Sequence, residues 1–242
     1  MYGPGIANMP IERSVLVLDG SVPRPALAQR LRRLGYRTLR AKCPEDAFRI
    51  VEDHRQQVAV ALIPPDLAVL DLRAALAALA ADAPGATLRY VVAGMRPVAE
   101  TLTELRAAGA DLALWEPFDD ARLRFQVNRA LASGAAAGPP RRELRAPVEV
   151  PAQVFQAGRQ KGARTYTVSA AGAYLETLRP ALRGAAVEVE LAIGPGALRL
   201  CGQVTLTNVP GNLQRANLPV GMGLCFEPVP DAAAQALCDK LK

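Results

Sequence analysis

The chain has 242 residues, of which 50% are hydrophobic and 5% aromatic, and it carries a formal net charge of +6 at pH 7. This length suits one or two domains that each bury a core of their own. The basic residues are scattered as single arginines, with no basic strip interleaved with aromatics, so the charge does not predict nucleic-acid binding.

Membrane insertion, secretion and metal binding are not expected either. Prolines and acids interrupt the long apolar stretch over residues 58–81, and the N-terminus has no charged region leading into an apolar one, so we expect a cytoplasmic protein. A metal site needs clustered ligands, but the chain has one histidine and no C-x-x-C pair, so we predict no metal and no cofactor. We expect the cysteines to be buried as small hydrophobes: Cys43, Cys201, Cys225 and Cys238.

Residues 13–132, after a loose leader over residues 1–12, alternate short apolar runs with segments of helical periodicity. The predicted strands cover residues 14–19, 36–41, 58–63, 89–93 and 111–115. The predicted helices cover residues 25–34, 44–54, 70–81, 98–108 and 119–132. Continuously apolar strands that alternate with helices are typical of a parallel sheet covered on both faces, so we predict a doubly wound α/β domain.

Residues 133–140 are small and end in two prolines, which indicates a linker. The chain from 141 to 242 then changes to strands of alternating polarity. The predicted strands cover residues 148–157, 165–168, 173–175, 186–193, 199–208 and 221–226, and the predicted turns 158–162, 183–184, 194–196 and 210–212. This pattern predicts an antiparallel β-barrel with a C-terminal helix over residues 231–242, capped by Asp231.

An arginine pair and a serine–glycine turn in the second domain indicate an anion-binding site. Arg141 and Arg145 form a donor array suited to phosphate oxygens, and their flat faces can stack on bases. Downstream, the Ser169-Ala-Ala-Gly172 turn supplies a hydroxyl, backbone N–H groups and a position without a Cβ atom. These groups suit an anionic, purine-bearing ligand better than they suit catalysis.

Residues 140–226 resemble a PilZ domain, a small β-barrel known for binding cyclic di-GMP, whose marks are R-x-x-x-R followed by [D/N]-x-S-x-x-G. The stretches that carry the resemblance are Arg141-Arg142-Glu143-Leu144-Arg145, Thr167-Val-Ser169-Ala-Ala-Gly172, Gly172-Ala-Tyr-Leu175, Gly202-Gln-Val204 and Gly221-Met-Gly-Leu-Cys-Phe226. The resemblance implies that cyclic di-GMP binds at Arg141, Arg142, Arg145, Thr167, Ser169 and Gly172. It also implies that the lead-in segment wraps around the ligand.

Thr167 departs from this pattern, because the family has Asp or Asn at its position. The resemblance implies that this residue accepts a hydrogen bond from the guanine edge. A threonine hydroxyl lacks the carboxylate charge and cannot accept two N–H groups side by side. Losing a charge-assisted bond costs about 1.5–3 kcal/mol, so we expect cyclic di-GMP to bind with weakened affinity.

The first domain resembles a response-regulator receiver (CheY-like), chiefly in Leu105-Arg-Ala-Ala-Gly-Ala-Asp111 and Trp115-Glu-Pro-Phe118. Receiver chemistry needs an acidic pair, an acceptor aspartate, a hydroxyl and a lysine. Asp19 survives from the pair, but Gly20 replaces the second acid, Ala93 or Gly94 replaces the hydroxyl, and Glu116 replaces the lysine. Asp66 follows two prolines and is expected to be misplaced as an acceptor. We therefore predict a pseudo-receiver that cannot be phosphorylated.

The sequence thus predicts a cyclic di-GMP effector or adaptor that couples nucleotide binding at the barrel to a protein partner on the pseudo-receiver face. The alternative is an adaptor that binds only proteins, which the threonine at the acidic position favours. A third hypothesis, a phosphorylated response regulator, predicts reaction with a phosphodonor at Asp66 or Asp19. No nucleophile–base pair or phosphate loop indicates an enzyme. Monomer and homodimer both stay open.

Overall fold

The structure is a computed structural model of the chain. It describes residues 13–54, 57–68, 71–74, 76–77, 88–107, 110, 112–133, 145–193, 196–215, 218–229, 234–235, 237 and 239. The predicted leader, nearly all of the predicted linker, Asp231 and Cys238 lie outside these residues. The chain divides into two compact units, Met1–Gly138 and Pro139–Lys242, while the exact domain boundaries stay predictions. Within the described residues no helix is long and apolar enough to cross a membrane.

The first unit is built on a five-stranded parallel sheet. Its strands are β1 (Ser14–Leu18), β2 (Arg37–Ala41), β3 (Val58–Ile63), β4 (Arg89–Gly94) and β5 (Ala113–Trp115), in the order β2-β1-β3-β4-β5. All four pairings are parallel. Every residue of β1 is buried, as its uninterrupted apolar sequence predicts for a strand covered on both faces.

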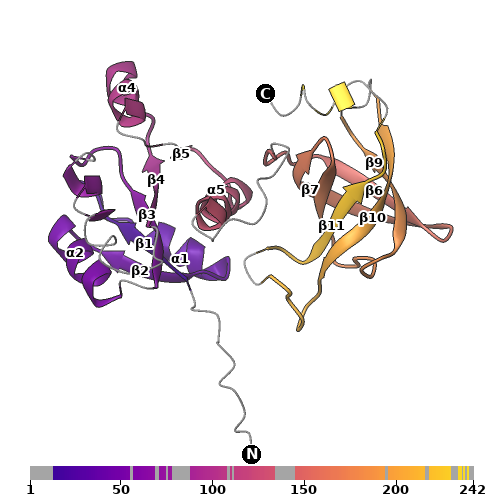
Figure 1. The fold of residues 1–242 in the computed structure, drawn as a ribbon, viewed down its shortest axis with the longest axis horizontal. Coiled ribbons are helices and arrows are strands. Elements are labelled where there is room, and N and C mark those ends of the chain that lie inside the picture. The colour runs from indigo at the N-terminus through magenta and orange to yellow at the C-terminus, as the bar shows by residue number, and fades with distance from the viewer. Residues whose placement is uncertain are drawn as a thin grey trace, which may run out of the picture. The chain divides into compact units, whose positions relative to one another are not determined.

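Helices cover both faces of this sheet (Figure 1). They are α1 (Pro25–Arg33), α2 (Pro44–Asp53), α4 (Ala99–Ala107) and α5 (Asp120–Ser133), and residues 71–74 and 76–77 are also helical. Leu31 of α1 and Leu123 of α5 pack in one core cluster, whereas Val51 of α2 and Leu105 of α4 pack in another on the opposite face. The predicted doubly wound, CheY-like α/β fold is confirmed.

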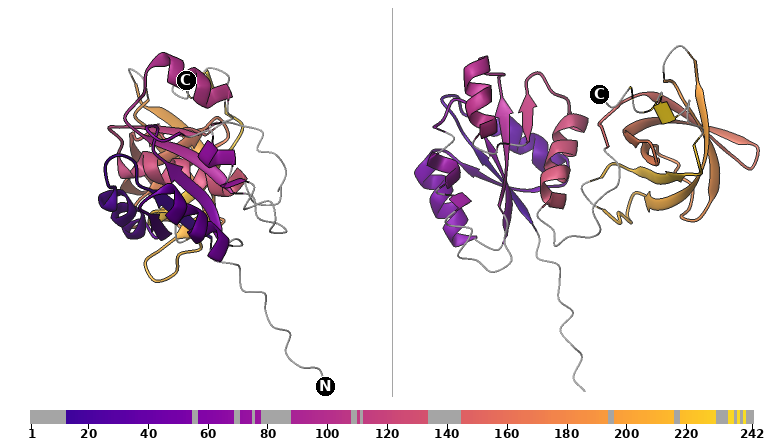
Figure 2. Two further views of the ribbon diagram at one scale, coloured as in Figure 1. Left: turned by 90° about the vertical axis from the view of Figure 1, so that its left-hand side faces the viewer. Right: turned by 45° about the horizontal axis from the view of Figure 1, so that its top comes forward.

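The second unit is a closed six-stranded antiparallel barrel (Figure 2). Its strands are β6 (Pro151–Gln156), β7 (Arg159–Ser169), β8 (Gly172–Glu176), β9 (Ala186–Leu191), β10 (Leu198–Asn208) and β11 (Gly221–Phe226), in the order β10-β11-β8-β7-β6-β9. Inward-facing aliphatic side chains such as Val168, Leu175 and Leu224 fill it. The predicted barrel, as in PilZ, is confirmed. Residues 234, 235, 237 and 239 of the predicted last helix are helical, and Leu237 is buried in the barrel core.

Two local predictions are wrong, one on a turn of the barrel and one on the burial of the cysteines. The turn predicted over residues 158–162 is confined to Ala157 and Gly158, whose φ angles of 47° and 73° make a tight two-residue hairpin turn. β7 then begins at Arg159, so β6 and β7 form a longer hairpin than expected. The described cysteines Cys43, Cys201 and Cys225 are exposed. The last two lie on outward positions of β10 and β11, where the alternation of the strand overrides the tendency of cysteine to be buried.

Gly172 is required by the close approach of two strands of the barrel. A Cβ atom at this position would lie 2.2 Å from the Leu224 carbonyl oxygen of β11. Gly221 and Gly202 are similarly constrained, because a Cβ atom on either would lie 2.0 or 2.6 Å, respectively, from a backbone carbonyl oxygen. The glycine of the S-x-x-G motif therefore has a structural function in strand packing.

We predict that Gly172→Ala lowers the free energy of unfolding of the barrel by about 1–3 kcal/mol, because the added methyl group forces β8 away from β11. Chemical denaturation followed by the near-ultraviolet circular dichroism of the barrel tyrosines measures this. Trp115, the single tryptophan, lies in the first unit, so its fluorescence transition should not move.

Gly162→Ala is the matched control, because nothing lies within 4 Å of a Cβ atom at that position. It should leave the barrel transition unchanged or raise it slightly. Equal unfolding midpoints for the two variants would contradict the packing function of Gly172.

Candidate ligand-binding site

The S-x-x-G motif forms the hairpin between β7 and β8. Val168 points into the barrel core, so its neighbours Thr167 and Ser169 lie on the outer face of β7. Ala170 and Ala171 make the turn, and Ser169 pairs with Gly172 across it. The hairpin is held against β11 by a hydrogen bond of 2.9 Å from the Phe226 N–H group to the Ala171 carbonyl oxygen.

A backbone bridge brings the lead-in segment to the same hairpin. The N–H group of Ala146 donates to the Val168 carbonyl oxygen at 3.0 Å, and the Val168 N–H group donates to the Ala146 carbonyl oxygen at 3.1 Å. One residue beyond this isolated bridge, Arg145 and Ser169 occupy the next positions of the same antiparallel register. Because paired residues share a face, Arg145 lies on the outer face with Ser169 and Thr167, and it is exposed. Arg141 and Arg142 lie outside the described residues.

The motif serine takes part in the structure of the hairpin. The Ser169 hydroxyl donates to the Gly172 carbonyl oxygen at 3.2 Å, and its side chain is buried. The glycine itself packs on β11. Both residues therefore have local functions that explain their positions without a ligand, and their contact with a nucleotide stays a prediction.

The two buried threonines of β7 differ in what their hydroxyl groups do. The Thr165 hydroxyl accepts from the Val150 N–H group at 2.8 Å and donates to the Val148 carbonyl oxygen. The Thr167 hydroxyl makes no hydrogen bond within the described part of the chain, although the residue is only 5% exposed. It lies opposite Tyr174 in the register. Thr167 is thus available to a ligand in a way that Thr165 is not.

The carboxyl end of the parallel sheet holds a second cluster of charged groups. Asp19, at the end of β1, is 4% exposed, and its carboxylate accepts two hydrogen bonds from the Arg40 guanidinium, one from Nη2 and one from Nε at 3.1 Å. The Arg24 backbone N–H group donates to the same carboxylate at 2.9 Å. The Arg24 guanidinium donates to the Ala93 carbonyl oxygen at the end of β4. These two arginines were not predicted from the sequence.

Asp66 is close to this cluster, so the prediction that two prolines misplace it is wrong. Its carboxylate accepts hydrogen bonds from the Ser21 hydroxyl and from the Ser21 N–H group, the latter at 2.8 Å. A Cβ atom at Gly20 would lie 2.5 Å from Asp66 Oδ1. The glycine that replaces the second acid therefore leaves the space that the Asp66 carboxylate occupies.

The pKa values of both aspartates are lowered. Burial raises the pKa of Asp19, but hydrogen bonds from Arg40 and Arg24 outweigh burial and hold it below its usual value. Burial likewise raises the pKa of Asp66, and the hydrogen bonds from Ser21, with the charge of Arg24, bring it below the usual value. Both carboxylates are therefore ionised at neutral pH, and the Arg40 guanidinium pairs with that of Asp19.

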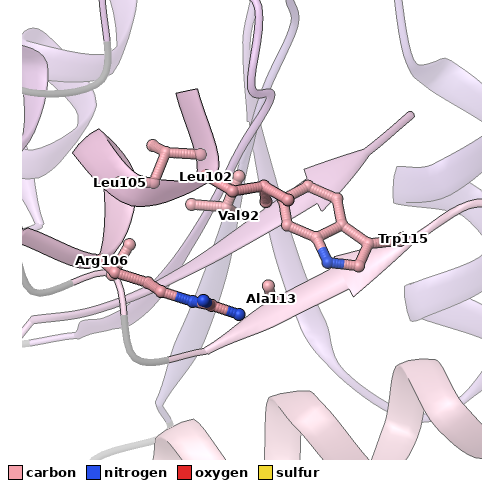
Figure 3. Close-up of a pocket in the computed structure, with 7 residues that line it drawn as sticks. Val92, Leu102, Leu105, Arg106, Ala113 and Trp115 are labelled. Carbon is pink, nitrogen blue, oxygen red and sulfur yellow. The ribbon is translucent and has the colours of Figure 1, made fainter. Parts of the chain in front are cut away.

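A hollow of about 340 Å³ lies beside α4 and β5 on the first unit (Figure 3). Its lining consists of Val92, Leu102, Leu105, Arg106, Ala110, Ala113 and Trp115. The lining combines aliphatic and aromatic side chains with polar surface, including the Arg106 guanidinium, which can pair with an acidic group.

Comparisons with known proteins give no family assignment. No protein-family model matches the chain, and no curated protein matches it. Three solved structures illustrate the similarities. The inhibitor of motility MotI/DgrA of Bacillus subtilis is 14% identical with a TM-score of 0.36, and the match covers 43% of this chain and 50% of that one. The chain therefore matches half the length of MotI/DgrA.

The other two are single domains. The PilZ domain of YcgR from Escherichia coli, solved with c-di-GMP, is 22% identical with a TM-score of 0.34, over 43% of this chain and 89% of that one. The chemotaxis protein CheY4 of Vibrio cholerae is 21% identical with a TM-score of 0.41, over 49% of this chain and 98% of that one. Since these scores are low, the fold assignment depends on the strand order of the sheet and the closure of the barrel.

Proposed function

We propose that the protein is a cyclic di-GMP effector whose barrel binds the nucleotide and whose pseudo-receiver contacts a protein partner. Arg141 and Arg145 bind the phosphates and stack on guanine, and Arg142 contributes charge. Ser169 and the backbone at Gly172 contact the ligand from the hairpin. Thr167 accepts a hydrogen bond from the guanine edge.

One observation carries this proposal: the Ala146–Val168 bridge aligns the end of the R-x-x-x-R motif with the S-x-x-G hairpin. Arg145, the one described residue of the first motif, is thereby brought beside the second motif, which supports a shared site. The Thr167 hydroxyl supports the same site, because it has no hydrogen-bond partner among the described residues and can therefore bond to a ligand. A cyclic dinucleotide has both the anionic phosphates and the guanine edge that these groups suit.

We further propose that the first unit is not phosphorylated. A receiver holds a divalent cation between its acids, whereas here guanidinium groups neutralise Asp19 and lie close to Asp66. The Arg24 guanidinium also lies against Gly94, since a Cβ atom there would be 2.6 Å from Arg24 Nη2. The position of the missing hydroxyl is therefore filled by a cation that repels a metal ion.

No enzymatic activity is proposed. The described part of the barrel site offers donors and acceptors that bind an anion, without a base placed to activate a nucleophile. The described residues also contain no group of acidic, cysteine and histidine side chains able to hold a metal ion.

The alternative function is a nucleotide-independent adaptor, and the hollow lined by Arg106 and Trp115 favours it. A hollow that combines aliphatic side chains with a cation suits a partner segment that presents an aliphatic side chain beside a carboxylate. This hollow lies in the first unit and uses none of the nucleotide-binding residues. The hollow is therefore compatible with both a cyclic di-GMP effector and a nucleotide-independent adaptor.

We expect purified full-length protein to release or absorb heat on titration with cyclic di-GMP, and Arg141→Ala/Arg145→Ala to lose at least about a hundredfold in affinity. Each arginine contributes charge-assisted hydrogen bonds of about 1.5–3 kcal/mol. Arg96→Ala/Arg122→Ala, which removes two exposed arginines of the first unit, should bind like the wild type.

Thr167→Asn tests the hydrogen-bonding role assigned to this position. The amide restores an acceptor and a donor that can face the guanine edge together, so affinity should rise by about tenfold. No heat with the wild type and none with Thr167→Asn would favour the nucleotide-independent adaptor.

Incubation with acetyl phosphate and Mg²⁺ should leave the protein unmodified, because the cation site is occupied by guanidinium groups. Intact-mass spectrometry under conditions that preserve acyl phosphates measures this. A phosphorylated peptide spanning residues 58–72 would contradict the proposal and identify Asp66 as an acceptor.

Arg40→Gln should lower the thermal unfolding midpoint of the first unit at pH 7, because it leaves the buried Asp19 carboxylate without its main partner. The folded-state pKa of Asp19 is lowered, so the stabilisation is complete above the unfolded value of about 3.9 and is lost as the pH falls through the folded-state pKa. The difference between wild type and variant, measured by Trp115 fluorescence, should shrink below about pH 4. Arg33→Gln, an exposed arginine of α1, should show no such pH dependence.

A further inference from the structure

The loop between β8 and β9, residues 177–185, holds two leucines in solvent. Leu178 is 86% exposed and Leu182 is 77% exposed. Between them, Ala181 is only 4% exposed, with its N–H group 3.3 Å from Met222 Sδ and its carbonyl oxygen accepting from the Thr207 hydroxyl at 2.9 Å. The loop is therefore anchored in the barrel at its middle while the leucines on either side face outward. We refer to residues 177–185 as the leucine–arginine loop.

Both ends of the leucine–arginine loop are also fixed. The Thr177 hydroxyl donates to the Gly162 carbonyl oxygen at 3.2 Å, and the Gly184 N–H group donates to the Val204 carbonyl oxygen at 2.7 Å. Because the backbone is already ordered, the leucines can contact a partner without the entropic cost of ordering a loop. Single exposed apolar side chains are common on protein surfaces, so these two leucines indicate a contact surface only together with the charges beside them.

Four cations belong to this loop and to the hairpin beside it. Arg179 and Arg183 belong to the loop, and Arg159 and Lys161 belong to the neighbouring β6–β7 hairpin. None of the four makes an ion pair or a side-chain hydrogen bond with another described residue. A hollow of about 350 Å³ lies between hairpin and loop, and its lining consists of Gln160, Lys161, Gly162, Thr177, Leu178 and Arg179. The hollow thus presents two uncompensated positive charges beside an exposed leucine.

We propose that the leucine–arginine loop docks the protein reversibly on the surface of an anionic lipid bilayer. Leu178 and Leu182 enter the boundary between headgroups and acyl chains, and the four cations stay at the level of the lipid phosphates. The hollow between Lys161 and Arg179 accommodates one phosphate headgroup. Nucleic acid would use the cations but not the leucines, so the combination favours lipid. This surface uses none of the residues proposed to bind cyclic di-GMP.

Co-sedimentation of the full-length protein with vesicles tests the proposal. Vesicles of phosphatidylcholine with a substantial fraction of phosphatidylserine should bind the protein, and vesicles of phosphatidylcholine alone should bind it much more weakly. Arg179→Ala/Arg183→Ala should weaken binding about fivefold for each cation removed, and high salt should have a similar effect. Leu178→Ser/Leu182→Ser should weaken binding at least tenfold, roughly as expected for withdrawing two aliphatic side chains from the bilayer boundary.

Matched controls remove the same groups elsewhere. Val22→Ser/Val98→Ser removes two exposed aliphatic side chains of the first unit, as a control for the leucine variant. Arg96→Ala/Arg122→Ala removes two positive charges of the first unit, as a control for the arginine variant. Both control variants should bind vesicles like the wild type. All variants should retain the barrel tyrosine spectrum. Absence of binding to anionic vesicles would overturn the proposal. Loss of binding in the arginine variant but not in the leucine variant would also overturn it, by identifying a general polyanion surface.

Discussion

Two backbone hydrogen bonds between Ala146 and Val168 are the constraint on which the ligand site depends. They fix the lead-in segment along β7, beyond the point where regular pairing with β6 ends. The register of β7 against β8 shifts between Thr165 and Thr167, so Tyr166 forms a bulge. The Thr165 hydroxyl satisfies the Val150 N–H group and the Val148 carbonyl oxygen there. The bulge, its threonine and the bridge together set Arg145 opposite Ser169.

The two units treat their polar groups differently. In the first unit, Asp19 and Asp66 are engaged by Arg40, Arg24 and Ser21, so both acids of the sheet end have partners within the unit. The carboxylates of this cluster already accept hydrogen bonds from the protein, so a metal ion would have to displace these donors. In the barrel, the Thr167 hydroxyl has no partner within the described residues. This difference is why we propose the second unit, and not the acidic end of the sheet, as the place where the nucleotide binds.

The elements of both folds could be predicted because hydrophobic periodicity reports burial directly. The uninterrupted apolar run of β1 predicts a strand covered on both faces, and the alternating polarity of β10 predicts a barrel strand. Features that depend on tertiary contacts could not be predicted. The packing of Gly172 on the Leu224 carbonyl and the return of Asp66 to Gly20 follow from how distant segments approach each other. The pairing of Arg40 with Asp19 could have been found from the sequence, because Arg40 lies near the end of β2, the strand beside β1.

Gly20 and Thr167 each stand where the corresponding motif has an acid, and the residues around them determine the effect of the replacement. At Gly20 the absence of a side chain leaves space, and the Asp66 carboxylate from the turn after β3 lies in this space. The charge is thereby retained while the metal-binding arrangement is replaced by an ion-paired one. At Thr167 the loss of an acid removes charge, but a hydroxyl without a hydrogen bond to described residues remains on the outer face. Both positions depart from the receiver and PilZ patterns, but Gly20 has a neighbouring carboxylate beside it, whereas the Thr167 hydroxyl has no hydrogen-bond partner among the described residues. The effect of replacing a motif residue therefore depends on whether a neighbouring side chain provides the group that is missing.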